Sequence, residues 1–265
     1  KATMADIISL TLTIISKNGT VNLNKDNKNT QITIGNKTYL MSINTLNFTK
    51  KMYSPGEIIA DIQFSITSGS WTKISKADLE TVFKKAEVSL AYSSQTICGG
   101  YYVHEIIPRY KKSNMYVTMK MYSPDKLMTL APDCRSFISM RLGRDIIEGQ
   151  KNNFKLPYNS NNTVEYDYSN MKQLSTTENY EEAIFPYLVQ YNESYWDFLV
   201  RTCNRWGEFL YFEGKKLHIG YDEKDTLDDK DNITTYDTIT YNDLNSQAIK
   251  IRSEERFSRN AETDI

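Results

Sequence analysis

The sequence predicts an α+β protein in which β-structure dominates, and three observations lead to this class. Apolar and β-branched residues alternate over long stretches, as they do in half-buried strands. Tyrosine is common, with 19 among 265 residues, and threonine is frequent; both favour pleated sheets. In two places the apolar spacing changes to that of a helix. The proportions of hydrophobic (40%) and charged (25%) residues are ordinary for a folded protein.

Five strands are expected between residues 7 and 67. They are the segments LTLTII, TVNLN, TQITI, TYLMSINTLNFT and EIIADIQFSI. Asn18-Gly19 and Gly35-Asn36 are turn dipeptides between them, because they supply the positive φ of tight hairpins. The sequence SGSW at 68–71 then interrupts the pattern.

The apolar N-terminal stretch DIISLTLTIIS alternates like a strand and lacks the small-residue cleavage site of a signal peptide. No segment approaches the roughly 20 apolar residues that a membrane-spanning helix needs. The sequence therefore predicts a soluble protein without a classical export signal.

A short helix is expected over residues 75–87. Ser75 is placed to cap it, with Asp78 three residues later, and one apolar stripe is formed by Leu79, Val82, Phe83 and Ala86. Strands return in VSLAYS, GGYYVHEIIPRYK and MYVTMKMYS, with Gly99-Gly100 as a bend or bulge. The pentapeptide KMYSP occurs at 51–55 and 120–124, where we expect strand ends to meet Ser-Pro turns.

After Pro124 the helical content is expected to rise. DKLMTLAPDCRSFISMRLGRDIIEGQ predicts one or two short helices with a break near Gly143, and residues 152–170 predict a polar loop between strands. Beyond residue 220 the sequence predicts an acidic exposed connection over 221–237. One or two closing strands in TITYNDLNSQAIKIRSEERF and a polar tail follow it.

Residues 192–220 form the most organised stretch. Ser194 is placed as the cap of a second helix, with Asp197 completing a capping box. Its apolar face consists of Trp196, Leu199, Val200 and Cys203, and Arg201, Asn204 and Arg205 fall on the other side. Gly207 is expected to end the helix, and a hairpin turns at Glu213-Gly214. A helix that folds back onto a hairpin through large aromatic side chains forms a packing unit. It carries no residue type that catalyses a reaction.

The sequence predicts no catalytic, cofactor or metal site. His104 and His218 lie far apart in predicted strands, and His104-Glu105 should point to opposite faces of a strand. The three cysteines form no C-x-x-C pair and are expected to be buried hydrophobes: Cys98, Cys134 and Cys203. The acidic run lacks the register of a calcium loop and is expected to be solvated: Asp222, Asp225, Asp228, Asp229 and Asp231. A net charge of -1 predicts no nucleic-acid partner.

The stretch from Gln190 to Gly220 resembles one shared by the valine-glycine-repeat (Vgr) spike proteins of type VI secretion and the hub proteins of contractile phage tails. The residues that carry the resemblance are Gln190, Tyr191, Glu193, Ser194, Trp196, Asp197, Phe198, Leu199, Arg201, Gly207, Leu210, Tyr211 and Phe212. Weaker similarity covers GGYYVHEIIPRYKKSNMYVTMKMYSPDKLMTL and CRSFISMRLGRDII.

The resemblance implies a barrel-like tube domain at 1–124, an α+β domain at 125–215, and the start of a second tube domain or closing strands at 216–265. It implies a non-enzymatic structural hub that joins a hexameric tube protein to a trimeric spike, contacts baseplate components and delivers effectors. The full-length protein would be a homotrimer, assembled in the cytoplasm and then secreted by the machine. Because the chain stops before the family's further domains, we expect it to be an N-terminal fragment or a short hub.

Two alternatives come from other classes of protein. The many tyrosines and asparagines suggest a secreted glycan- or surface-binding β-domain protein, which exposed aromatic pairs on a concave sheet would favour. An enzyme would need a pocket in which two carboxylates converge.

Overall fold

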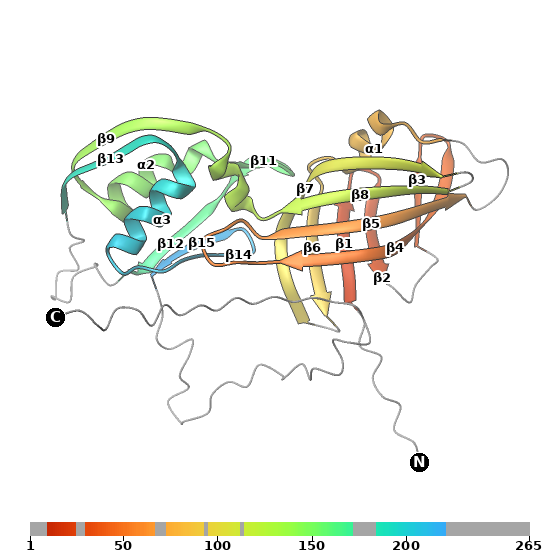
Figure 1. The fold of residues 1–265 in the computed structure, drawn as a ribbon, viewed down its shortest axis with the longest axis horizontal. Helices are drawn as coiled ribbons and strands as arrows, with labels where there is room; N and C mark the ends of the chain where they lie inside the picture. The colour runs from red at the N-terminus through yellow and green to blue at the C-terminus, as the bar shows by residue number, and fades with distance from the viewer. Residues whose placement is uncertain are drawn as a thin grey trace, which may run out of the picture.

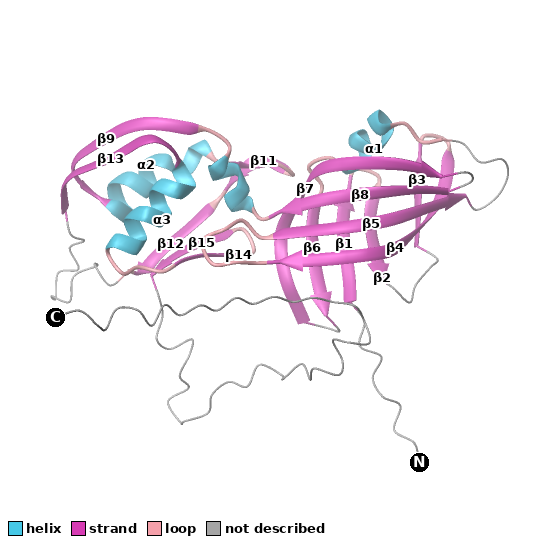
Figure 2. Cartoon of the chain, viewed as in Figure 1, coloured by secondary structure: helices cyan, strands magenta, loops and turns pink. Residues whose placement is uncertain are grey.

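The computed structural model describes residues 10–24, 30–66, 73–92, 95–111, 114–171 and 184–220. They form two lobes side by side (Figure 1). We call residues 10–122 the barrel lobe and residues 124–220 the α+β lobe. Strands dominate both lobes (Figure 2), which confirms the predicted β-rich α+β class.

The barrel lobe is one antiparallel sheet of eight strands in the order β2-β1-β6-β7-β8-β5-β4-β3. The strands are β1 (Leu10–Ser16), β2 (Gly19–Asn24), β3 (Thr30–Ile34), β4 (Lys37–Thr49), β5 (Glu57–Ile66), β6 (Glu87–Tyr92), β7 (Gln95–Lys111) and β8 (Asn114–Tyr122). The end strands β2 and β3 meet through side chains. The Thr30 hydroxyl donates to the Asn22 carbonyl at 2.7 Å, and the Asn18 amide donates to the Thr33 carbonyl at 2.8 Å. The sheet therefore curls into a nearly closed barrel.

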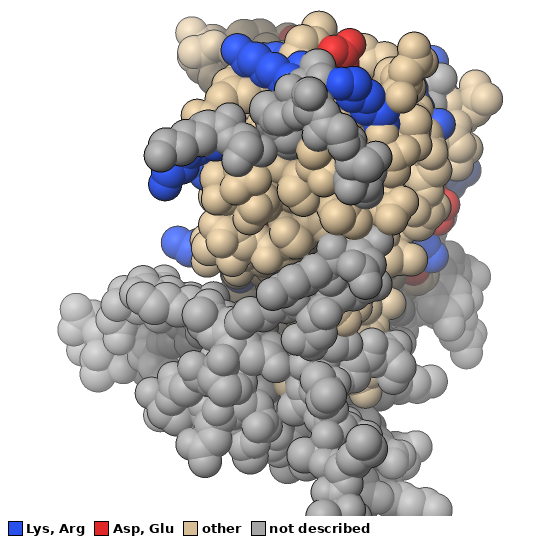
Figure 3. Space-filling view, turned by 90° about the vertical axis from the view of Figure 1, so that its right-hand side faces the viewer, with Lys and Arg blue, Asp and Glu red and all other residues tan. Residues whose placement is uncertain are grey.

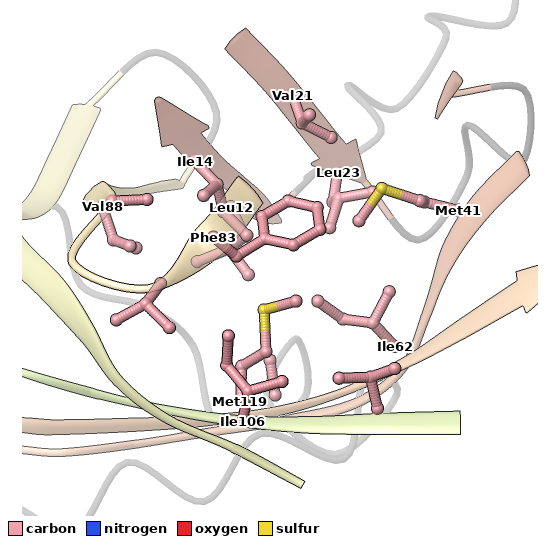
Figure 4. Close-up of a cluster of buried hydrophobic side chains, with 14 of the residues drawn as sticks. Leu12, Ile14, Val21, Leu23, Met41, Ile62, Phe83, Val88, Ile106 and Met119 are labelled. Atoms are coloured by element: carbon pink, nitrogen blue, oxygen red, sulfur yellow. The ribbon is translucent and has the colours of Figure 1, made fainter. Parts of the chain in front are cut away.

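Alternation of apolar and polar residues fills the barrel interior, because successive side chains of a strand point to opposite faces. In β5 and β8 every second residue is buried over most of the strand. Helix α1 (Lys76–Phe83) adds Phe83 to this core, where it lies among apolar side chains of several strands (Figure 4). Its ring also meets Phe64 of β5 edge to face at 6.3 Å. As predicted, Ser75 caps α1, since its Oγ accepts the N–H of Asp78 at 3.1 Å.

A 3-10 turn, η1 (Pro124–Thr129), leads into the α+β lobe. Its strands are β9 (Pro132–Arg141), β10 (Lys155–Leu156), β11 (Asn159–Thr163), β12 (Glu165–Asn170), β13 (Ile184–Ser194), β14 (Leu210–Glu213) and β15 (Lys216–Gly220). Its helical turns are η2 (Leu142–Ile147), α2 (Glu148–Gln150), η3 (Lys151–Asn153) and the longer α3 (Tyr195–Arg205).

Three small sheets build this lobe: β9 with β13, β10 with β11, and β12-β15-β14. Figure 1 shows α3 between the β9–β13 pair and the β12-β15-β14 sheet. The α3 residue Phe198 stacks on Phe137 of β9 at 5.4 Å, and Trp196 meets Phe212 of β14 at 6.3 Å. The helix thus supplies the core that both sheets cover.

Several predictions for this lobe were wrong. Residues 125–150 were expected to hold one or two short helices, and besides the helical turns they contain strand β9; residues 152–170, expected to be a loop, hold β10, β11 and β12. Gly143 lies inside η2 and breaks no helix; a Cβ there would come 2.7 Å from the ring of Tyr168, so close packing explains this glycine. Strand β13 was not anticipated.

The predicted limits 1–124, 125–215 and 216–265 stay predictions. The limit at 215 falls inside the β14–β15 hairpin, and β15 also pairs with β12. The break at 68–71, the acidic run and the closing strands beyond 220 lie outside the described residues. Within the described ranges, no helix is long and apolar enough to cross a membrane.

Candidate functional site at the junction of the two lobes

The helix cap predicted at Ser194 is present. Its Oγ accepts the Asp197 N–H at 3.1 Å and donates to the Asp197 carboxylate at 2.6 Å. Just before the cap, the buried Gln190 amide donates to the Glu193 carbonyl at 3.0 Å. Gly207 ends the helix with φ +72°, the left-handed conformation that glycine adopts without strain.

Arg201 fixes α3 to β13. Its guanidinium binds the Glu193 carboxylate at 2.5 Å and the Val189 carbonyl at 2.6 Å. It also lies over the ring of Phe198, 5.7 Å from the centroid. Hydrogen bonding to Glu193 raises the pKa of Arg201. A charge-assisted pair of this kind orients the helix more firmly than packing alone.

Trp196 reaches out of the α+β lobe to the barrel lobe. Its side chain is 3% exposed, and its indole N–H donates to the Tyr53 carbonyl at 3.0 Å, in the connection between β4 and β5. An indole buried without an acceptor would lose the hydrogen bond it makes with water. The motif is therefore more than a local packing unit, because it forms part of the contact between lobes.

Further contacts between the lobes surround this one. The Lys50 ammonium donates to the Phe212 carbonyl at 3.3 Å, and Lys215 pairs with Glu87 at 2.9 Å. The Tyr158 hydroxyl donates to the Gly100 carbonyl at 3.2 Å. In each contact, a residue of the barrel lobe meets a residue of the α+β lobe that is far from it in the sequence.

Gly100 allows the tip of the β14–β15 hairpin to approach the barrel. Its φ is +69°, and an added Cβ would lie 2.7 Å from the Gly214 carbonyl oxygen. The sequence predicted a bend or bulge at Gly99-Gly100, and the register of β6 and β7 shifts there. Glycine at this position therefore allows both the bulge and the close approach of the two backbones.

A buried carboxyl group lies where the chain passes from one lobe to the other. Asp125 accepts hydrogen bonds from the Ser123 hydroxyl and, at 3.1 Å, from the Lys126 N–H. Ser123 in turn accepts the Gly56 N–H at 2.7 Å. Burial raises the pKa of Asp125 to about 6, against the opposing effect of these hydrogen bonds and of Lys50.

The lobes leave an open groove of about 1010 Å³ between them. Its walls are the β4–β5 connection, the beginning of β7, and β14 with the residue before it. Four large apolar side chains on these walls are between 37% and 57% exposed: Met52, Ile97, Phe209 and Tyr211. An apolar, partly exposed groove of this kind is where an interaction site is expected.

The family-motif residues fall into three groups. Five of them are buried in the interior or between the lobes: Ser194, Trp196, Phe198, Leu199 and Phe212. Asp197 and Arg201 are exposed and fix the helix through hydrogen bonds at its surface. Tyr191 is 78% exposed on β13, and Tyr211 stacks on His218 with ring centroids 4.9 Å apart.

The prediction that His104 and Glu105 face opposite ways was wrong. The register of β7 against β8 shifts between Val103 and Glu105, so the bulge turns both side chains outward. Glu105 pairs with Lys120 at 2.8 Å, and His104 meets the rings of Tyr102 and Tyr122 edge to face. In the part of the chain that the structure describes, no group of three or more His, Cys, Asp or Glu residues could hold a metal ion.

The cysteine prediction needs one correction. Cys98 and Cys203 are buried, and burial raises the pKa of both to about 12, which suppresses thiolate chemistry. Cys134 is exposed on β9, where its sulfur accepts the Asn192 N–H at 3.3 Å.

Sequence reasoning missed the barrel side of the junction. Tyr53 and Ser123 belong to the two KMYSP copies, and the lobes join beside both of them. The first copy forms the β4–β5 connection, and the second ends β8 and begins η1. The repeat was therefore the signal that could have located the junction.

No protein-family model matches the chain, and no curated protein matches it either. Among solved structures it is similar to the 43 kDa tail protein of prophage MuSo2 from Shewanella oneidensis. That match has 11% identity and a TM-score of 0.49, and it covers 80% of this chain and 53% of the tail protein. The chain spans about half the length of the tail proteins that it matches.

Two further matches concern type VI secretion. The E. coli c3393 protein, a component of that system, gives 8% identity and a TM-score of 0.49 over 71% of this chain and 50% of that one. A Francisella PdpA-VgrG complex gives 13% identity and a TM-score of 0.35 over 85% and 30%. The predicted resemblance to Vgr spike proteins and phage tail hubs is thereby confirmed, and it concerns the fold.

Proposed function

We propose that this chain is part of a structural hub in a contractile injection machine, where it joins a hexameric tube to a trimeric spike. One observation carries the proposal. The motif that resembles the hub family caps and locks α3, and through Trp196 it also holds the α+β lobe to the barrel lobe.

The contacts at the junction suit a mechanical role. Four contacts join the α+β lobe to the barrel lobe at Lys50, Tyr53, Glu87 and Gly100, so the barrel is held at several separate points. A coupling of this kind transmits displacement of one lobe to the other. Figure 3 views the end of the barrel lobe that lies away from the α+β lobe; uncharged side chains cover most of the described part of that face, and charged ones, mostly basic, lie around its margin.

In this proposal the full-length protein is a homotrimer assembled in the cytoplasm and secreted by the machine without a signal peptide. The tube protein, the baseplate components and possible effectors are its partners. In this proposal the protein acts through its contacts with other proteins and catalyses no reaction.

The experiment is to purify the full-length protein together with a candidate tube protein from the same organism and to examine the complex by electron microscopy. A threefold particle with tube rings stacked on its barrel lobes is expected. Analytical ultracentrifugation gives the subunit number independently. A monomer that leaves the tube protein unbound at micromolar concentration would contradict the hub role.

A second candidate is a glycan- or surface-binding protein, and one observation favours it. Tyr187 and Tyr191 are exposed on β13, on the same face of the β9–β13 pair. Exposed aromatic rings are the groups on which sugars stack. A glycan-array signal that Tyr187→Ala and Tyr191→Ala abolish would support this candidate, and a blank array would remove it.

A further inference from the structure

Among the described residues no strand pairs with the edge of β14 that faces the groove. Strand β14 pairs with β15 alone and is the end strand of its sheet in the described part of the chain. A two-residue turn with Gly214 at φ +58° closes the hairpin at the Glu213–Lys216 pair. Hydrogen-bonded pairs alternate along an antiparallel ladder, so Glu213 and Tyr211 bond to β15. Leu210 and Phe212 therefore direct their N–H and C=O groups away from β15.

Two contacts agree with this alternation. The Gly220 N–H donates to the Phe209 carbonyl at 2.9 Å, as the next bonded pair requires. The Phe212 carbonyl points outward, because it accepts the Lys50 ammonium at 3.3 Å. Among the described residues nothing else bonds to the outward N–H of Phe212 or to the outward N–H and C=O of Leu210. Both residues line the groove. Backbone groups at a buried position are normally paired, and none of the described residues pairs with these three groups.

The groove has the shape and polarity of a strand site. Its volume of about 1010 Å³ reaches the upper limit of small-molecule pockets, roughly 300–1,000 Å³, and it is open to solvent. The exposed apolar side chains Met52, Ile97, Phe209 and Tyr211 lie on several of its walls. Alternate residues of an added strand would meet these walls, while the main chain pairs with β14.

Charge limits the choice of occupant. Lys50 and Lys51 are exposed on one wall, and neither makes an ion pair within the described residues. Glu213, the acidic residue at the end of β14, lies 3.7 Å from His218. A bound segment would therefore bind more tightly if it carried a carboxylate that forms charge-assisted hydrogen bonds with these lysines.

We propose that an extended segment of a partner polypeptide, apolar at alternate positions and carrying a carboxylate, binds in this groove as an added strand on β14. The proposal does not depend on the hub role, since it follows from the hydrogen-bond pattern of β14 and the groove walls.

The test uses the full chain and an acetylated, amidated hexapeptide in which valine and threonine alternate and one threonine is replaced by aspartate. Two further peptides carry N-methyl groups, either on the valines or on the remaining polar residues. A strand has its N–H groups on alternate edges, so only one methylated peptide can keep all its bonds to β14. We expect one to lose about tenfold in affinity and the other to bind like the parent, as the loss of one or two hydrogen bonds to the outward carbonyls of Leu210 and Phe212 implies.

Protein variants locate the site. Ile97→Glu should abolish binding and Lys51→Glu should weaken it, whereas Lys111→Glu, at the far end of β7, is the matched control and should bind normally. Circular dichroism checks that each variant is folded. Absence of binding at millimolar peptide, equal binding of both methylated peptides, or normal binding to Ile97→Glu would each overturn the proposal. Concentration-dependent protection of the Leu210 amide without peptide would overturn it too, because a second copy would then occupy the edge.

The result is separate from the hub test. A chain that assembles with the tube protein but binds no peptide refutes only the strand site. A chain that binds the peptide but never assembles refutes only the hub.

Discussion

Trp196 combines two roles at the scale of a single residue. Its ring fills the core of the α+β lobe beside Phe212, and its N–H holds the carbonyl of Tyr53 in the other lobe. We expect Trp196→Ala to lower the free energy of unfolding by about 3–5 kcal/mol, since a large cavity forms and the partly buried Tyr53 carbonyl loses its donor. Urea denaturation measures this. Trp206→Ala, at a position 43% exposed, is the control and should cost less than half as much. Equal losses would contradict the packing role of Trp196.

Asp125 predicts a pH dependence of stability. Its pKa is about 6 in the folded protein, above the value of 3.8 for an unburied aspartate. The folded state therefore binds the proton more tightly, and this group makes the protein less stable as the pH rises from about 4 to about 6. Asp125→Asn should remove this contribution, so its stability relative to the parent should increase across that interval. A difference between the two proteins that stays constant from pH 4 to 7 would show that Asp125 titrates normally.

The two histidines are expected to be dispensable. His104 lies exposed on a bulge against tyrosine rings, and His218 stacks on Tyr211 with Asp167 and Glu213 each 3.7 Å away. Among the described residues neither histidine belongs to a group of three or more His, Cys, Asp or Glu residues that could hold a metal ion. His104→Ala and His218→Ala should leave the biological activity intact. A secretion or particle-assembly assay measures this, with Trp196→Ala as the variant that should fail. Loss of activity in a folded His218→Ala protein would reveal a role that packing does not explain.

At the scale of elements, local signals predicted most of the barrel lobe and the stretch from Ser194 to Gly220. Caps, turn glycines and alternation act within a few residues, so the sequence displays them directly. Strand β9 was not predicted, because apolar residues also lie on its exposed face, where Ile138 and Met140 point outward. The alternation of apolar and polar residues that marks a strand is therefore missing. Its partner β13 lies about fifty residues later, and no local pattern indicates that pairing.

The cap of α3 can be tested by itself. Ser194→Ala removes the acceptor of the Asp197 N–H, and we expect a loss of about 1 kcal/mol in the free energy of unfolding. Ser194→Asp restores an acceptor at the same place and should recover most of that loss. Thermal unfolding followed by circular dichroism compares the three proteins. If the aspartate variant is no more stable than the alanine variant, the cap contributes little.

At the scale of the whole molecule, the junction was the feature that sequence reasoning could not place. The motif residues were identified, yet their docking onto the barrel depends on Lys50, Tyr53 and Gly100, which are separated from them by around a hundred residues or more. Such contacts follow from the path of the chain, and no periodicity within α3 or β14 reports them.

Gly100 tests the coupling of the lobes. Gly100→Val places a branched side chain at positive φ and against the Gly214 carbonyl, so the hairpin tip must withdraw from the barrel. We expect calorimetry to resolve two unfolding transitions in place of one. Gly149→Ala is the matched control, because no atom lies within 4 Å of its added Cβ, and it should keep a single transition. A single, unshifted transition for Gly100→Val would mean that the lobes unfold independently of this contact.

The order of the contacts along the chain also sets the order of events during translation. Every strand of the barrel has emerged once Tyr122 leaves the ribosome, but Trp196 and Phe212, which meet Tyr53 and Lys50, come much later. The roughly 90 residues between Tyr122 and Phe212 take on the order of 5–20 s to synthesise. For that time the nascent barrel presents the carbonyl of Tyr53 and the apolar side chain of Ile97 without their covering lobe. A ribosome-associated chaperone would find its substrate there.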